Sequence, residues 1–169
     1  MFSLKRLATA PDPFDGIQHM VEPIYYEDLT LGDIYLAPER IIVEEDLSLF
    51  AQVSGDDHPI HTSDTYAQST PFKRRIAHGP FGIAMAIGQF GRIPGFQETA
   101  IAMTNVNNWK FRIPIYVGDE ITVEVCILNK ALRGPCVGLI ERGFRLTKAD
   151  GTVAQEGRSS MLIARRPPL

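Results

Sequence analysis

The stretch Pro80-Phe81-Gly82-Ile83-Ala84-Met85-Ala86-Ile87-Gly88-Gln89-Phe90 decides the fold, because it predicts a helix that is apolar on almost every side. Pro80 suits the first helical position, where an N–H would have no partner inside the helix. The stretch is shorter than the roughly 20 residues that cross a bilayer. A helix that is apolar all round is expected to be buried all round.

Turn signals divide the chain after this helix into strands. Gly118-Asp119 and Asp150-Gly151 mark two of the turns. The expected strands cover residues 101–103, 109–113, 120–128, 137–146 and 153–163. One apolar helix followed by antiparallel strands predicts an α+β domain whose sheet curves around the helix, which is the hot-dog fold. A flat sheet with the helix on one face would instead require a polar stripe along the helix.

The first half of the chain contains shorter elements. A strand is expected over 34–43, after the turn Leu31-Gly32-Asp33. Glu44-Glu45-Asp46 then opens a short helix, since acidic residues suit a helix N-terminus, and a second short helix is expected over 64–68. Residues 23–166 are therefore expected to form one hot-dog domain. Residues 1–22 are rich in Pro, Asp and Gly, and they are expected to form either an extended arm or a disordered tail.

Composition excludes several classes of protein. The 169 residues suffice for one domain, and 44% are hydrophobic. A net charge of −3 gives no basic excess for nucleic-acid binding. Cys126 and Cys136 fit neither a disulfide framework nor a metal motif, so reduced thiols, no metal site and a cytoplasmic location are expected. We expect no membrane span and no secretory signal.

The chemistry is expected around Asp56 and His61, which lie five residues apart in Ser54-Gly55-Asp56-Asp57-His58-Pro59-Ile60-His61. Pro59 disfavours helical backbone at His58, which favours an irregular loop here. Such a loop could bring a carboxylate and an imidazole together over one small ligand, where the pair could activate water near neutral pH. Taken alone the pattern is weak, because most such pairs are solvated or cap a helix.

The wider stretch Phe50-Ala51-Gln52-Val53-Ser54-Gly55-Asp56-Asp57-His58-Pro59-Ile60-His61, followed by Ala67, resembles the signature of the MaoC-like, R-specific enoyl-CoA hydratases. His58 replaces the Asn of that signature. Tyr25 to Asp33, Arg75 to Gly79 and Trp109 to Glu120 also resemble segments of the family, so that the resemblance extends to about Arg165.

The resemblance implies reversible addition of water to a trans-2-enoyl thioester, giving an (R)-3-hydroxyacyl thioester. It implies that Asp56 is the general base, that His61 shares in water activation and proton relay, and that the Gly79 N–H is the oxyanion donor. A free N–H at a helix start independently suits developing enolate charge. The family Ser about two turns into the central helix is replaced here, where Ile87 stands, so its role is not transferred.

The resemblance also indicates which residues surround the substrate. Ser54, Gly55, His58 and Pro59 are expected to contact it, and His78 is expected beside the active site. The basic residues Lys73 and Arg74, with Arg75, are expected either to meet the phosphates of CoA or phosphopantetheine or to form an ordinary solvated surface.

Two other functions stay open from the sequence. One is a hot-dog acyl-CoA thioesterase, although the Asp-to-His spacing suits a hydratase better. The other is a non-catalytic acyl-thioester binding module, against which the intact Asp56, His61 and Gly79 count. The expected partners are the thioester substrate and a second copy of the chain, as a homodimer or dimer of dimers, because pairing covers an exposed strand edge. No cofactor is expected beyond the CoA or carrier-protein phosphopantetheine of the substrate.

Overall fold

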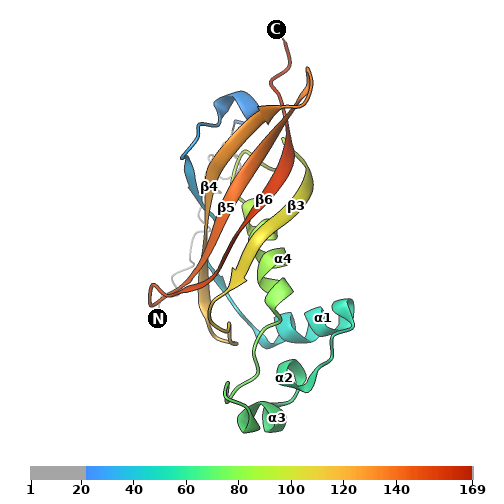
Figure 1. The fold of residues 1–169 in the computed structure, drawn as a ribbon, viewed down its shortest axis with the longest axis vertical. Coiled ribbons are helices and arrows are strands. Elements are labelled where there is room, and N and C mark those ends of the chain that lie inside the picture. Colours follow the sequence, from blue (N-terminus) through green and yellow to red (C-terminus); the bar gives the residue numbers. More distant parts are fainter. Residues whose placement is uncertain (1–21, 169) are drawn as a thin grey trace, which may run out of the picture.

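A computed structural model describes residues 22–168, in which one curved antiparallel sheet packs around one helix (Figure 1). The expected arm, apart from Glu22, lies outside the described residues. The sheet has the strand order β1-β4-β5-β6-β3, and the short β2 also pairs with β4. The strands are β1 (Ile34–Leu36), β2 (Arg40–Ile41), β3 (Ala100–Phe111), β4 (Glu120–Leu132), β5 (Val137–Lys148) and β6 (Val153–Ala164).

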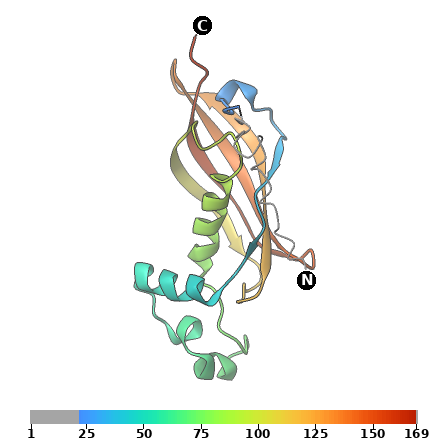
Figure 2. The same ribbon diagram turned by 180° about the vertical axis from the view of Figure 1, so that it is seen from behind.

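Helix α4 (Gly79–Phe90) is the predicted central helix, and the sheet curves around it (Figure 2). Phe81, Met85 and Phe90 are buried in one core cluster with the inward residues of β4 and β5. Gly82 is needed for this packing, because a Cβ there would lie 2.3 Å from Oε1 of Gln155 on β6. The prediction of a sheet wrapped around one helix is therefore confirmed.

The expectation that α4 is buried on every side is wrong for the described chain taken alone. Pro80, Ala84 and Gly88, four residues apart along one stripe, are exposed. The sheet covers the opposite side of the helix, and no other described element covers this stripe (Figure 2). The apolar character of α4 therefore exceeds what burial within one described chain requires.

Two strand predictions need correction. The expected strand 34–43 is divided into β1 and β2, because Pro38 between them cannot donate to a ladder. The expected strands 101–103 and 109–113 form one strand, β3, whose pairing with β6 shifts register three times. Asn108 has a φ of 51° at one of these irregularities, which explains why the sequence pattern is interrupted there.

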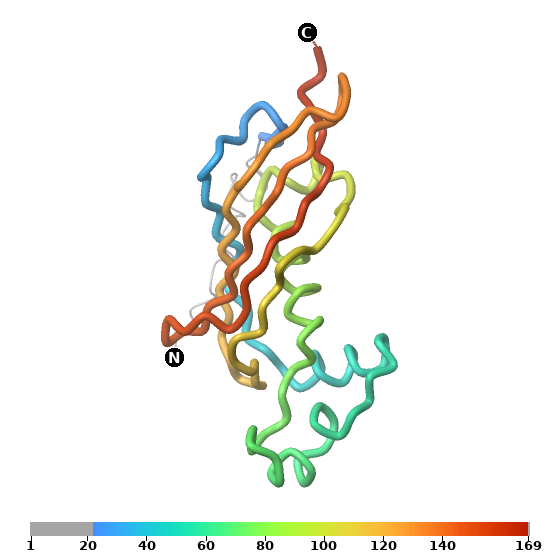
Figure 3. The backbone as a smooth tube through the Cα atoms, viewed as in Figure 1, coloured from blue at the N-terminus to red at the C-terminus, as the bar shows by residue number. Residues whose placement is uncertain are grey.

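Three short helices lie beyond one end of the sheet, next to the start of α4 (Figures 1 and 3). They are α1 (Glu44–Ser54), α2 (Pro59–Thr62) and α3 (Asp64–Ser69). At the other end of the sheet, the 3₁₀ turn η1 (Tyr26–Asp28) is tied to the chain terminus, since Glu27 and Asp28 bind Arg165 and Arg166. No helix in residues 22–168 is long and apolar enough to cross a membrane.

Candidate active site

The end of α1 determines where Asp56 lies. Gly55 caps this helix with a left-handed φ of 73°, a conformation that glycine adopts without strain. The Ser54 hydroxyl donates to the Phe50 carbonyl at 2.6 Å and accepts the Asp56 N–H at 3.2 Å. Ser54 and Gly55 therefore turn the chain so that the Asp56 carboxylate leaves the helix. Ser54 and Gly55 therefore shape the backbone of the loop, and neither directs a side chain at a ligand.

His61 lies in α2, a short helix in a stretch whose sequence predicts an irregular loop. Pro59 does force extended backbone at His58, with φ −51° and ψ 135°, but it then serves as the first residue of a four-residue helix. Nδ1 of His58 accepts the Ile60 N–H at 3.2 Å and so caps this helix. An Asn side chain could form the same cap, which explains how His58 is accommodated at the position where the signature has Asn.

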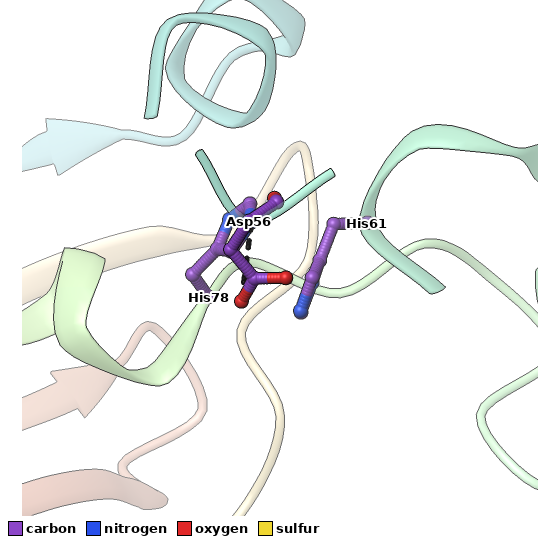
Figure 4. Close-up of side chains that lie close together, drawn as sticks. All are labelled: Asp56, His61 and His78. Carbon is purple, nitrogen blue, oxygen red and sulfur yellow. Dashed lines mark hydrogen bonds and ion pairs between the residues drawn. The ribbon is translucent and has the colours of Figure 1, made fainter. Parts of the chain in front are cut away.

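Asp56, His61 and His78 come together from three elements, and their nearest ligand atoms all lie within 4.8 Å of one another (Figure 4). The Asp56 side chain is 56% exposed, whereas that of His78 is 1% exposed. The rings of His61 and His78 stack with centroids 3.7 Å apart. Asp56 and His61 therefore face the solvent side of the cluster, and His78 lies behind them.

The tautomer of His61 follows from its hydrogen bond. Nδ1 lies 2.7 Å from the Ile76 carbonyl, which can only accept, so Nδ1 carries the proton and Nε2 of the neutral ring has a free lone pair. The pKa of His61 is lowered, mainly because burial disfavours the charged ring and further because His78 lies against it. The neutral, proton-accepting form of His61 is thus favoured near pH 7.

Gly79 begins α4 directly after His78, which is the N-cap residue. Within the described residues its N–H has no hydrogen-bond partner, as expected for the first residue of a helix. Its carbonyl accepts from Nε2 of Gln155 at 3.3 Å, which holds this end of the helix against β6. The helix start therefore offers a fixed donor to a negatively charged oxygen.

Two hollows border these groups. One, of about 280 Å³, adjoins Gly79 and is mainly apolar, with Phe72, Ile76, Phe111 and Ile113 among its lining residues. The other, of about 480 Å³, adjoins His61 and lies between α1 and α2. A larger hollow of about 890 Å³ lies over Gly143 on the outer face of the sheet. We place the reaction at the hollows beside Gly79 and His61, because the hollow on the outer face of the sheet borders neither residue.

The three side chains of the cluster could in principle ligate a metal ion, but their geometry favours another use. The stacked rings of His61 and His78 are only 26° from parallel, so their in-plane lone pairs do not converge on one point. Nε2 of His78 is also engaged with the Asp56 carbonyl at 2.8 Å. The arrangement suits a water molecule held between Asp56 and His61 better than a metal ion.

The basic cluster is only partly available to a ligand. Arg75 is bound to Glu44 at 2.6 Å and to Asp64 at 2.7 Å, so it joins α1 to α3. Arg74 lies over the Tyr116 ring, 5.0 Å from its centroid, and donates to the Val117 carbonyl. Lys73 has a left-handed φ of 62° and its side chain is exposed. Lys73 and Arg74 thus remain the two members that lie near solvent without an acidic partner among the described residues.

Sequence reasoning did not assign a role to three groups that shape the site. The Ile76 carbonyl fixes the His61 tautomer, Gln155 anchors Gly79, and Phe50 packs against His78 with ring centroids 5.1 Å apart. Phe50 is the aromatic residue of the signature quoted above, so the sequence did indicate that it matters. The other two act through the fold, because a backbone carbonyl and a distant strand residue leave no local motif.

The fold and the cluster define a class: a hot-dog protein with a carboxylate–imidazole pair beside the start of its central helix. The MaoC like domain model matches residues 29–137, which include the pair, the central helix and strands β1 to β4. The chain belongs to the MaoC-like dehydratase family.

Individual relatives agree with this placement. The (R)-specific enoyl-CoA hydratase of Rhodospirillum rubrum is 33% identical over 144 residues, which are 84% of this chain and 93% of the relative. The unliganded R-hydratase PhaJ1 from Pseudomonas aeruginosa is 29% identical with a TM-score of 0.71, and the match covers 88% of this chain and 97% of that one. The monoamine oxidase regulatory protein from Archaeoglobus fulgius shares the fold, with 24% identity, a TM-score of 0.80 and coverage of 88% and 99%.

Proposed function

We propose that this chain is a MaoC-like (R)-specific enoyl-CoA hydratase, a hydro-lyase that adds water reversibly to a trans-2-enoyl thioester. The observation that carries the proposal is the pairing of an exposed Asp56 carboxylate with the free Nε2 of His61, beside a helix start whose N–H has no partner in the described residues. The hydratase names of the relatives support the same reaction.

The geometry suggests how the three groups share the work. One water would donate its two hydrogens to Asp56 and to Nε2 of His61, which leaves an oxygen lone pair directed at Cβ of the enoyl group. Asp56 takes a proton as the new C–O bond forms, and a proton is delivered to Cα through the Asp56–His61 pair. The Gly79 N–H stabilises the enolate oxygen, whose charge is larger in the transition state than in the bound substrate.

The acyl chain and the phosphates of the substrate are assigned to regions of the chain by their chemistry. The apolar hollow beside Gly79 suits the start of an acyl chain. Lys73 and Arg74 are exposed in the segment between α3 and α4, where they could bind the phosphates of CoA or of a carrier-protein phosphopantetheine. His58 and Pro59 are expected to border the substrate near His61. No cofactor beyond the substrate's own thioester carrier is needed for the proposed steps, and we expect a cytoplasmic enzyme.

We further propose that two copies pair through β3. This strand is the end of the sheet order, so one of its edges has no strand partner among the described residues. Ile101, Met103 and Phe111 on it are at least half exposed. Phe111 also lines the hollow beside Gly79, so a partner that covers β3 would enclose the substrate site.

The test of the function is hydration of crotonyl-CoA and longer enoyl-CoA thioesters, followed by loss of the conjugated-enoyl absorbance and chiral analysis of the product. Asp56→Asn and His61→Gln should each lower kcat by roughly 10²- to 10⁴-fold, the usual effect of losing a positioned acid or base. Circular dichroism and melting should show that both variants are folded. Near wild-type turnover in both, an S-configured product, or release of free CoA without hydration would reject the assignment.

A further inference from the structure

We infer that His78 is a positioning residue that aligns the water-activating pair and the oxyanion donor as one unit. The inference rests on the proposed function, which assigns roles only to Asp56, His61 and Gly79. His78 contacts or adjoins all three. Its Nε2 lies 2.8 Å from the Asp56 carbonyl, its ring stacks on His61, and its backbone precedes Gly79 as the N-cap of α4.

The position of His78 rules out direct contact with the substrate in this arrangement. Its side chain is 1% exposed and packs between His61 and Phe50. It therefore lies behind the proposed reacting groups and supports them from the protein side.

The hydrogen bond to Asp56 identifies the tautomer. A carbonyl oxygen only accepts, so Nε2 of His78 must donate to it. Nδ1 is buried and has no hydrogen-bond partner in the described residues. A tautomer with its proton on Nδ1 would leave that N–H without an acceptor and would lose the bond to the Asp56 carbonyl, so the site favours the Nε2–H tautomer.

Two separable effects on the active site follow. The donated hydrogen bond fixes the backbone of Asp56, and with it the direction of a carboxylate that otherwise extends into solvent. The flat ring covers one face of His61 and keeps water from it. The side chains that face His61 are Asp56, His58 and His78, together with the Ile76 carbonyl, and His78 is the one whose ring stacks on it. Burial, to which this stacked ring contributes, is the main cause that lowers the pKa of His61.

Two matched substitutions separate these effects. His78→Gln keeps an N–H donor for the Asp56 carbonyl but removes the aromatic ring. His78→Phe keeps a flat ring against His61 but removes the donor. We expect the Phe variant to lose about 10- to 10²-fold in kcat with crotonyl-CoA, at nearly unchanged KM, because a displaced catalytic group costs about that much. The Gln variant should recover most of this loss.

The pH profile should show the opposite pattern. In the Gln variant water reaches His61, so the acid limb of kcat/KM should move to higher pH, while the Phe variant should keep the limb near that of the wild type. If His78 had only a structural role, both variants would melt at lower temperature, but the kcat loss would not be confined to the Phe variant and the shift of the acid limb would not be confined to the Gln variant. A folded Phe variant with wild-type kcat, or equal kcat losses in both variants, would overturn the inference.

A measurement on the unmodified protein guards against variants that fail to fold. Long-range ¹H–¹⁵N spectra of the histidine rings at pH 7.5 should show the Nε2–H form for His78, and the Nδ1–H form would overturn the inference. This experiment needs no activity. If the wild type hydrates no enoyl-CoA, the proposed function fails, whereas a failure confined to the His78 results leaves that function in place.

Discussion

At the scale of single residues, the ring of His61 is constrained on two sides. Nδ1 is bound to the Ile76 carbonyl and one ring face is covered by His78. Burial and the neighbouring ring lower the pKa of His61, so the ring stays neutral at pH values where an ordinary histidine, with a pKa near 6.5, begins to protonate. Because the proposed reaction needs the free lone pair on Nε2, activity depends on this neutral form.

We therefore expect kcat/KM to stay constant as the pH is lowered to 6.5 and to fall at lower pH, as His61 gains its second proton. In the unfolded chain the same residue protonates first, so the contribution of His61 to stability should also decrease as the pH drops through about 6.5. A rate profile from pH 5 to 9 and melting curves over the same range would measure both. An acid limb above pH 6.5 would contradict the assignment of His61 as a proton acceptor.

His58 makes a second residue-level prediction, since its side chain replaces Asn at the cap of α2. The imidazole Nδ1 accepts the Ile60 N–H, and an Asn oxygen should do the same. His58→Asn should therefore keep activity and change the melting temperature by no more than about 3 °C at pH 8. His58→Ala removes the cap and should cost about 1 kcal/mol of stability.

At the scale of elements, local pattern predicted helices α1, α3 and α4 closely, because each combines an apolar stripe or run with a start signal in a few residues. It failed where distant parts of the chain decide. The continuity of β3 depends on pairing with β6, some fifty residues away, which tolerates the interruption at Asn108. Helix α2 was missed because four residues are too few for periodicity.

The start of α4 carries the element-level prediction. Gly79→Pro removes the proposed oxyanion N–H, and we expect about 10²- to 10³-fold lower kcat. His78 already has the extended backbone that precedes proline, with ψ 139°. The new Pro-Pro pair disfavours helical backbone at position 79, so melting must be measured beside the rate.

Gly79→Ala is the control, because it keeps the N–H. Its methyl group would lie 3.0 Å from Cε1 of Phe111, so this ring must shift slightly. Phe111 is 54% exposed, which gives it room to do so. The Ala variant should thus retain far more activity than the Pro variant. Equal rates in two folded variants would place the oxyanion donor elsewhere.

At the scale of the whole molecule, sequence predicted the sheet wrapped around one helix, because an apolar helix and a run of strands allow few arrangements. It also indicated Asp56, His61 and Gly79 as one site through their motifs. It could not show that His78 joins them, since that contact arises only when α4 begins beside the loop after α1. It likewise could not show which face of α4 stays open, because every residue along the helix except Gln89 is apolar or small.

That open face and the free edge of β3 lead to the prediction for the assembly. Light scattering should give about twice the chain mass of 18.8 kDa. Replacing Ile101 and Met103 together by lysine should yield a folded monomer, since both side chains are already at least half exposed in the single chain. Lysines facing one another across a strand edge repel and oppose pairing.

The control is Leu132→Lys, which changes an exposed apolar residue at the last position of β4, three strands away from β3 in the sheet order. It should remain dimeric and active. The β3 variant should lose activity together with its partner, because Phe111 lines the hollow beside Gly79 and is left facing solvent when the edge is uncovered. A wild-type monomer that hydrates crotonyl-CoA at full rate would show instead that one chain encloses the substrate by itself.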